Sequence, residues 1–250
     1  MLNLFIGHDA NEITAYHVLS HSLISRATAP ISITPLVRDH FRPFFTRERG
    51  PLDSTDFSMS RFLVPYLSGY HGYAIYMDCD MLMREDITQI WHDLLPPSPT
   101  PAIWVCQHDY TPKTVLKMQN QLQTPYARKN WSSFMIFNNS ECRALTPDYV
   151  NTATGLQLHR FAWLREDQIG SLPLDWNWLV GEYPANVKAK NLHFTLGGPW
   201  LKDYRTCDYA DLWFEEYHCM TGQDFYAQQV WERAATQATS LGDVGTVGPG

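Results

Sequence analysis

Two aspartates in an apolar segment are the residues of this sequence best suited to carry chemistry. Asp78 and Asp80 flank Cys79 in the run YMDCDMLM, whose remaining residues are apolar or aromatic. An ionised carboxylate in such surroundings is destabilising unless a cation compensates its charge, and the nearest basic residue in the sequence is Arg84. Two carboxylates that follow a buried strand suit a hard divalent cation. A triplet of this kind also serves to cap a following helix, so both interpretations stand at this level.

A histidine later in the chain is the candidate for a nitrogen ligand. His193 lies in LHFTLGGPW, just before Gly197 and Gly198, whose missing side chains would let the backbone approach an anion closely. A histidine among apolar residues is more often a core or surface residue than a ligand. If His193 joins Asp78 and Asp80, the mixed oxygen and nitrogen set favours Mn²⁺, with Mg²⁺ as the alternative.

Strands that alternate with helices must position these side chains. Short apolar runs predict strands, and apolar residues at helical spacing predict helices. The expected strands are 2–6, 31–37, 73–83, 102–108 and 134–138, and the expected helices are 12–25, 55–70, 86–95, 147–153, 159–164, 208–217 and 223–238. This order predicts an α/β fold with a Rossmann-like, mostly parallel central sheet flanked by helices. Ligands then bind at the carboxyl ends of the strands.

Aromatic and histidine residues at two of those strand ends are further candidates for ligand contacts. His108 and Asp109 end the strand expected at 102–108, where they would contact an acceptor or a nucleotide, or else cap the next segment. Trp176 and Trp178 suit stacking on an acceptor sugar, although packing in the core is at least as common for tryptophan.

Composition and charge limit the classes of protein and of partner. The chain has 250 residues, of which 44% are hydrophobic and 18% charged, as in a folded globular protein. Its net charge of −7 disfavours nucleic acid as a partner. Five cysteines without a CxxC pair indicate free thiols in a reducing compartment, so we expect a cytoplasmic protein.

Membrane contact and domain organisation follow from the distribution of residues along the chain. No apolar run approaches the roughly 20 residues that span a bilayer, which predicts no transmembrane segment. The basic segment 38–49 leaves peripheral contact with a membrane open. We expect one domain over residues 1–233. The segment 234–250, which is rich in glycine, is expected to be a flexible tail or a linker.

Six segments together resemble the family 8-type glycosyltransferases of the GT-A fold, which include bacterial lipopolysaccharide galactosyl- and glucosyltransferases and glycogenin. In chain order they are FIGHDANEITAY, FSMSRFLVPYL, YMDCDMLM, NWSSFMIFN, EDQIGSLPLDWN and HFTLGGPW, and the resemblance covers residues 1–217. It implies a GT-A fold and an enzyme that moves a hexose from a nucleotide sugar, in particular a UDP-sugar, to a glycan or small hydroxyl acceptor. It further implies dependence on a metal and retention of anomeric configuration.

The resemblance also implies roles for individual residues. His8 and Asp9 would lie near the base and ribose of the donor, and Arg61 would contact its phosphates or sugar. Asp78, Asp80 and His193 would be the metal ligands, with Asp78 also at the donor. Asp167 and Gln168 would lie at the sugar and the reacting centre as the catalytic pair, although Asp167 also suits a plain helix cap.

The sequence departs from the family pattern at the expected diphosphate site. Gly198 stands where the family usually has a lysine, just before Pro-Trp. Lys202, a basic residue of the segment 38–49, or the backbone of Gly197 and Gly198 could replace that lysine. Serines also replace the usual Ala-Gly in NWSSFMIFN.

Two other classes of function compete with a transferase. A sugar nucleotidyltransferase also uses an α/β fold and aspartate-bound Mg²⁺, but it requires a glycine-rich phosphate loop that the segment after the first strand does not supply. A non-catalytic nucleotide- or glycan-binding module of a larger synthase is compatible with the glycine-rich tail. Binding alone does not need a metal on a leaving group, so the metal residues favour the enzyme.

Overall fold

A six-stranded sheet in the order β2-β1-β3-β8-β5-β9 forms the centre of the protein in the computed structural model, which describes residues 1–50, 53–94, 100–113, 116–117, 121–122 and 127–222. Its strands are β1 (Leu2–Gly7), β2 (Ile31–Leu36), β3 (Tyr73–Met77), β5 (Ile103–Cys106), β8 (Phe134–Asn138) and β9 (Ile169–Leu172). Every strand but β8 runs in one direction, and β8 is antiparallel to both of its neighbours. The predicted mostly parallel sheet is therefore confirmed.

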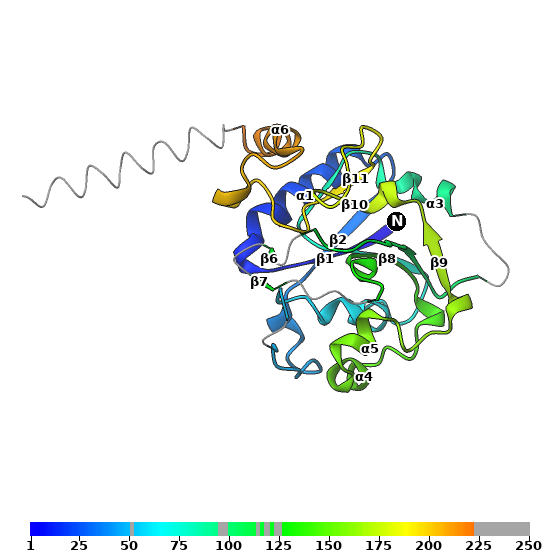
Figure 1. Ribbon diagram of the computed structural model, residues 1–250. Helices are drawn as coiled ribbons and strands as arrows, with labels where there is room; N and C mark the ends of the chain where they lie inside the picture. The colour runs from blue at the N-terminus through cyan, green and yellow to red at the C-terminus, as the bar shows by residue number, and fades with distance from the viewer. Residues whose placement is uncertain (51–52, 95–99, 114–115, 118–120, 123–126, 223–250) are drawn as a thin grey trace, which may run out of the picture.

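Helices cover the sheet on both sides. They are α1 (Ile13–Arg26), α2 (Val64–Leu67), α3 (Ile90–Asp93), α4 (Pro147–Thr152), α5 (Gly155–His159) and α6 (Ala210–Thr221). Figure 1 shows α1 and α6 on one side of the sheet and α4 and α5 on the other. The strands β3, β5 and β8 are apolar on both faces because both faces are covered, and only their end residues Tyr73 and Asn138 are not fully buried.

The chain leaves the main sheet at the two aspartates, so the apolar run 73–83 does not form one strand. The two carboxylates follow a buried strand, as the metal interpretation of the sequence requires. Strand β3 ends at Met77, and β4 (Met81–Met83) pairs instead with β11 (Asn191–His193), next to β10 (Trp178–Leu179), in a second, three-stranded sheet. The backbone of Asp78 still bonds to the main sheet through Ser133. Both halves of the segment are buried, so hydrophobicity alone could not reveal the break.

Two further expectations about helices differ from the structure. Instead of a helix over 159–164, α5 begins at Gly155 because Thr154 and Gln157 form a capping box. It ends before Phe161, whose φ is 55°. In place of the helix expected over 55–70, the structure has a 3-10 turn, Ser60–Leu63, followed by the short helix α2. Pro65 lies in the first turn of α2, where a proline is tolerated. The helix expected over 223–238 and the domain boundary at 233 lie outside the described residues.

Among the described residues, no helix is both long enough and apolar enough to cross a membrane.

A buried glutamate joins α6 to α1. Glu216 contacts the imidazole of His21 at 2.6 Å and the guanidinium of Arg26 at 2.7 Å. The side chain of Glu216 is 7% exposed, whereas those of His21 and Arg26 are 31% and 34% exposed. The carboxylate is thus removed from water and depends on the Arg26 guanidinium and on its contact with His21. This contact fixes the last described helix against the body of the domain.

Glu216→Ala should lower the free energy of unfolding by about 1–3 kcal/mol, because both contacts to the carboxylate are lost while the partly exposed side chains of His21 and Arg26 regain water. Denaturation by urea measures the change. Glu215→Ala is the matched control, since Glu215 is an exposed neighbour on the same helix. Equal stability of the two variants would contradict the anchoring role of Glu216.

Candidate functional site

The break between β3 and β4 brings the three predicted metal ligands together. Asp78 directly follows β3, Asp80 directly precedes β4, and His193 is the last residue of β11. One ligand atom from each lies within 4.8 Å of the other two, and Nε2 of His193 is 3.3 Å from Oδ1 of Asp80. The site lies at the carboxyl end of β3, where an α/β sheet binds ligands.

The orientation of His193 suits coordination through Nε2. Its Nδ1 donates a hydrogen bond to Oδ1 of Asn177 at 2.9 Å, and the amide group of Asn177 donates to Oγ of Ser133 at 2.9 Å. Asn177 is therefore held with its oxygen toward the imidazole, which places the proton on Nδ1 and the lone pair on Nε2. His193 is 2% exposed and Asn177 is fully buried.

Arg61 supplies the positive charge that the sequence requires near the aspartates. Its NH1 lies 2.9 Å from Oδ1 of Asp78 and donates to the carbonyl of Ser132 at 2.9 Å. The hydroxyl of Tyr76 donates to the same carboxylate at 2.5 Å. Burial raises the pKa of Asp78, and the Arg61 guanidinium acts in the opposite direction. Arg61 thus lies at the candidate site, as predicted, and its side chain holds Asp78.

Glu12 is a buried carboxyl group next to the site that no motif of the sequence marks. It is 4% exposed, and its Oε2 accepts a hydrogen bond from the Cys79 thiol at 3.5 Å. Burial raises the pKa of Glu12 from its ordinary value of 4.5 to about 8, with smaller contributions from Asp80 and Asp9. Burial also raises the pKa of the Cys79 thiol, so Cys79 stays protonated. No local pattern distinguishes Glu12 from an ordinary residue at the start of a helix.

Asp9 has a structural role at the end of β1. Its Oδ1 accepts from the backbone and side-chain nitrogens of Asn11 at 2.9 and 3.1 Å, and its Oδ2 accepts from the backbone nitrogen of Asp56 at 3.0 Å. At 2% exposure, this carboxylate ties the turn after β1 to the segment around residue 56. His8 is half-buried, and its ring lies edge-on to Tyr16 at 5.4 Å.

Packing explains the glycine that replaces the family lysine. A Cβ on Gly198 would lie 1.9 Å from the ring of Trp200, so no side chain fits at this position. Gly197 has a φ of 133°, a conformation that residues with a Cβ rarely adopt, and a Cβ there would lie 2.8 Å from Tyr204. Lys202 is exposed in a 3-10 turn after this loop. The loop is therefore shaped by ring packing.

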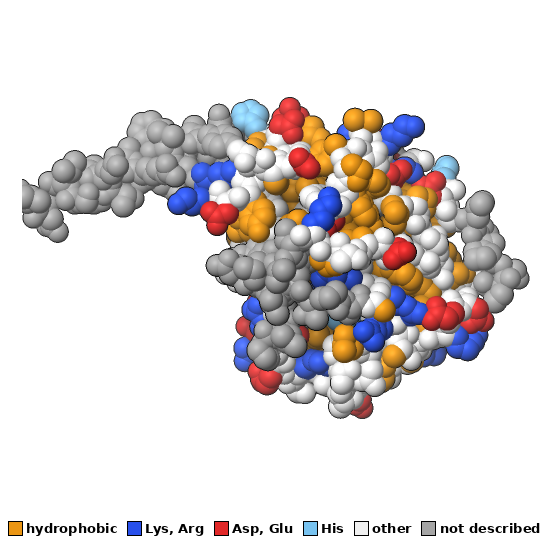
Figure 2. Space-filling view, viewed as in Figure 1, with side chains coloured by type: hydrophobic (Ala, Val, Ile, Leu, Met, Phe, Trp, Pro, Cys, Tyr) orange, Lys and Arg blue, Asp and Glu red, His pale blue; other side chains and the backbone are white. Residues whose placement is uncertain are grey.

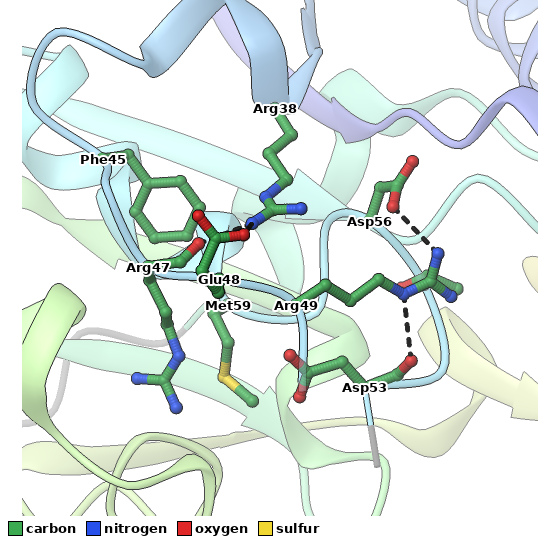
Figure 3. Close-up of a pocket in the computed structure, with 9 residues that line it drawn as sticks. Arg38, Phe45, Arg47, Glu48, Arg49, Asp53, Asp56 and Met59 are labelled. Carbon is green, nitrogen blue, oxygen red and sulfur yellow. Dashed lines mark hydrogen bonds and ion pairs between the residues drawn. The ribbon is translucent and has the colours of Figure 1, made fainter. Parts of the chain in front are cut away.

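The arginines of the basic segment mainly hold the segment itself. Figure 3 shows a small pocket lined by Arg38, Phe45, Arg47, Glu48, Arg49, Asp53, Thr55, Asp56 and Met59. Arg38 donates to the carbonyl of Arg47, Arg47 to the carbonyl of Val150, and Arg49 pairs with Asp56 at 3.0 Å. The guanidinium groups that could replace the family lysine are therefore already bound to other residues of this protein.

The structure does not bring Asp167 and Gln168 to the triad. Gln168 directly precedes β9, whose first residue pairs with Ile103 at the start of β5. This is the edge of the sheet opposite the one where β3 ends, and a five-residue strand separates the two edges by about 16 Å. Asp167 is exposed and pairs with Arg165 at 3.1 Å. The role implied for the two residues at the reacting centre therefore has no support in this geometry.

A curated relative places the chain in a family. Protein CDI of Arabidopsis thaliana is 44% identical over 222 residues, which cover 85% of this chain and 85% of the relative. The chain belongs to the family of Protein CDI. The name of this relative states no activity, and no family model matches the sequence.

Solved structures similar to this member of the CDI family show its fold. They include the WbbM bifunctional glycosyltransferase (13% identity, TM-score 0.57, 93% of this chain and 51% of that chain) and GlyE of Streptococcus pneumoniae TIGR4 (12%, 0.57, 92% and 64%). Another is the galactosyltransferase LgtC in complex with donor and acceptor sugar analogs (12%, 0.55, 88% and 96%). The chain thus spans about half of the WbbM chain and under two thirds of the GlyE chain. The predicted GT-A fold is confirmed.

Glu12→Gln should change how stability depends on pH. The folded protein keeps the Glu12 proton up to about pH 8, whereas the unfolded chain releases it above about 4.5. The wild type should therefore lose stability between these pH values, relative to the variant, by on the order of 3 kcal/mol.

Urea denaturation from pH 5 to pH 8.5, in buffer with a chelator, measures this difference. Glu141→Gln is the control, because Glu141 is an exposed glutamate. Parallel stability profiles for the wild type and Glu12→Gln would refute the assignment of a buried, protonated Glu12.

Proposed function

We propose that this protein is a metal-dependent glycosyltransferase that transfers a hexose from a nucleotide sugar, in particular a UDP-sugar, to a hydroxyl acceptor. The observation that carries the proposal is the cluster of Asp78, Asp80 and His193 at the carboxyl edge of a GT-A sheet. Three buried or half-buried ligand atoms within 4.8 Å of one another are costly to assemble without a cation. The fold by itself would not support the activity.

The donor set fits a divalent metal ion. Two carboxylates and one imidazole leave coordination positions for phosphate oxygens and water, and the nitrogen ligand favours Mn²⁺ over Mg²⁺. When bound, such an ion stabilises the negative charge that develops on the departing diphosphate. Asn177 contributes by holding the imidazole in the tautomer that coordinates through Nε2.

The remaining residues of the site act on the donor through charge and position. Arg61 pairs with Asp78 and adds positive charge beside the place expected for the diphosphate. In the turn at Gly197 and Gly198, the backbone nitrogen of Gly197 already donates to the carbonyl of Phe194 at 2.8 Å. We therefore propose that the backbone nitrogen of Gly198 is the one that contacts the phosphates. Asp9 supports the nucleotide side of the site indirectly, by fixing the turn that carries His8. The bond from the anomeric carbon to the diphosphate breaks, the bond to the acceptor oxygen forms, and the proton of the acceptor hydroxyl passes to the departing diphosphate, with retention implied by the resemblance.

A sugar nucleotidyltransferase fits the structure less well. Such an enzyme needs room for a triphosphate against the turn after the first strand. Here a Cβ on Gly7 would lie 2.5 Å from the ring of Phe57, so an aromatic side chain fills the space beside this turn. A non-catalytic binding module would keep the same fold and ligands, and only turnover distinguishes it from the transferase.

The wild type with Mn²⁺ should slowly release nucleotide from one sugar donor in a panel of UDP-, GDP- and CMP-sugars without acceptor. Asp80→Asn should reduce this release by at least about 100-fold, because it removes a charged ligand of the metal that stabilises the leaving group. A coupled nucleotide-detection assay measures the rate, and a chelator should abolish it.

The control is Asp203→Asn, since Asp203 is an exposed aspartate outside the site. Metal-dependent binding of a nucleotide sugar without turnover would favour the binding module. Absence of both binding and turnover across the panel would refute the proposal. The NMR spectrum of the first-formed product decides whether the anomeric configuration is retained.

Gln168→Ala tests whether Gln168 is catalytic, as the resemblance implies, or remote from the reaction, as its position in the sheet indicates. Because Gln168 lies at the opposite edge of the sheet, we expect it to change the release rate by less than about threefold, as for surface substitutions away from a site. Asp167→Asn should behave in the same way. A loss of 100-fold in either variant, with unchanged thermal stability, would restore the catalytic role that the resemblance implies.

A further inference from the structure

Three aromatic side chains, Tyr110, Trp178 and Tyr183, form a wall beside the triad. The ring of Tyr183 lies 5.1 Å from that of Trp178 and 5.9 Å from that of Tyr110, measured between centroids. All three are partly exposed. Figure 2 shows hydrophobic side chains on the surface over the segment that carries β10 and β11. We call these three residues the aromatic wall.

His108 lies behind the aromatic wall with one ring nitrogen uncommitted. It follows β5 and is 4% exposed, and its Nδ1 shares a hydrogen bond with the hydroxyl of Tyr183 at 3.0 Å. Its carbonyl accepts from Nε1 of Trp131 at 2.8 Å, which fixes the backbone. Its Nε2 is buried and has no hydrogen-bond partner among the described residues. A buried polar atom without a partner is costly, so a ligand group is the expected partner.

The chemistry of this nitrogen suits a neutral group. Burial lowers the pKa of His108 to about 3, and the nearby His193 adds to the effect. The imidazole is therefore neutral in the physiological range, and Nε2 either donates or accepts one hydrogen bond, depending on the tautomer that Tyr183 selects. A hydroxyl group can satisfy Nε2 in either case. A phosphate or carboxylate would gain no charge compensation from it.

Hydrogen bonds connect the aromatic wall to the triad. The side chain of Asn130 donates to the hydroxyl of Tyr110 at 2.7 Å, and its carbonyl accepts from Oγ of Ser133 at 2.7 Å. Ser133 in turn accepts from Asn177, which holds His193. Asn130 has a φ of 62°, a strained conformation that allows it to face both sides. The wall and the metal ligands are thus two adjoining parts of one site.

We propose that the acceptor is a sugar, which stacks on the aromatic wall and forms a hydrogen bond from a ring hydroxyl to Nε2 of His108. This inference rests on the proposed transferase function and names its acceptor class. The faces of aromatic rings pack well against the C–H groups of a pyranose, while the hydroxyls need polar partners at the edge. Tyr183 serves both purposes, since its ring belongs to the wall and its hydroxyl fixes His108.

Binding of methyl pyranosides tests the proposal directly. Methyl glucoside, galactoside, mannoside and N-acetylglucosaminide are added at millimolar concentration, with and without UDP and Mn²⁺, and saturation-transfer NMR detects contact with the protein. At least one pyranoside should receive saturation at its ring C–H protons. His108→Phe and Trp178→Ala should each reduce this signal at least fivefold, because the first removes the hydrogen bond to the sugar and the second removes part of the stacking surface. The control, Tyr73→Phe, should retain it, since Tyr73 lies at the opposite end of β3.

Kinetics with the pyranoside that binds provide the second test. Tyr183→Phe keeps the ring and removes the hydroxyl that orients His108, so the acceptor KM should rise by about 10-fold, as for a lost hydrogen bond. The dissociation constant of UDP with Mn²⁺ should change by less than about threefold in the same variant, which separates acceptor recognition from a general loss of structure.

The outcomes separate this inference from the proposed function. If UDP and Mn²⁺ bind but no pyranoside receives saturation, or if His108→Phe and Tyr183→Phe bind pyranoside as the wild type does, the sugar-acceptor proposal is wrong and the transferase proposal stands. If no nucleotide sugar of the UDP, GDP and CMP panel is bound or turned over by the wild type, the transferase proposal fails. The pyranoside signal measured without UDP still decides whether the aromatic wall binds sugar.

Discussion

The structure depends on the need to compensate buried carboxylates at the point where the chain passes from one sheet to another. Asp78 keeps its backbone bond to the main sheet, and the carbonyl of Asp80 already accepts from Phe194 in the second sheet. The side chains of Asp78 and Asp80 at this junction are 14% and 6% exposed. Arg61 compensates one of them, and a divalent cation would compensate the other.

A polar network extends from this point and gives the site its internal order. Asn177, Ser133 and Asn130 are linked by hydrogen bonds and connect His193 on one side with Tyr110 on the other. None of these residues has a charge, so the network orients the groups around it without adding to the cost of burial. A ligand at one end is therefore coupled physically to the geometry at the other. This arrangement is consistent with a site that holds a donor and an acceptor side by side.

The departure from the family pattern at Gly198 has a structural explanation. The ring of Trp200 occupies the space that a side chain at this position would need. Arg38, Arg47 and Arg49, which could have supplied the missing charge, are bound to the carbonyls of Arg47 and Val150 and to the carboxylate of Asp56. Under the proposed function, contacts to a diphosphate would come from Arg61 and backbone nitrogens of this chain together with a bound metal ion. The chain thus has the GT-A fold without a side chain at the position of the family lysine.

The sequence by itself determined the strands β1, β2, β3, β5 and β8, the helices α1 and α6, the fold class and the residues of the triad. These features can be read from local patterns. The spacing of apolar residues indicates which residues are buried, and aspartates among buried residues indicate that a cation lies nearby. The resemblance to glycosyltransferases added the GT-A fold, which the structure confirms.

Only the tertiary structure decided which sheet each buried segment joins and which edge each loop occupies. Residues 73–83 are equally apolar on both sides of the break, so no local signal marks the passage from β3 to β4. The segment with Asp167 and Gln168 matched a family motif, but the pairing of β9 with β5 places it at the edge away from the triad. Glu12, Asn177 and Asn130 gain their roles from partners distant in sequence. Strand pairing and long-range hydrogen bonds carry this information, and neither is encoded in residue spacing.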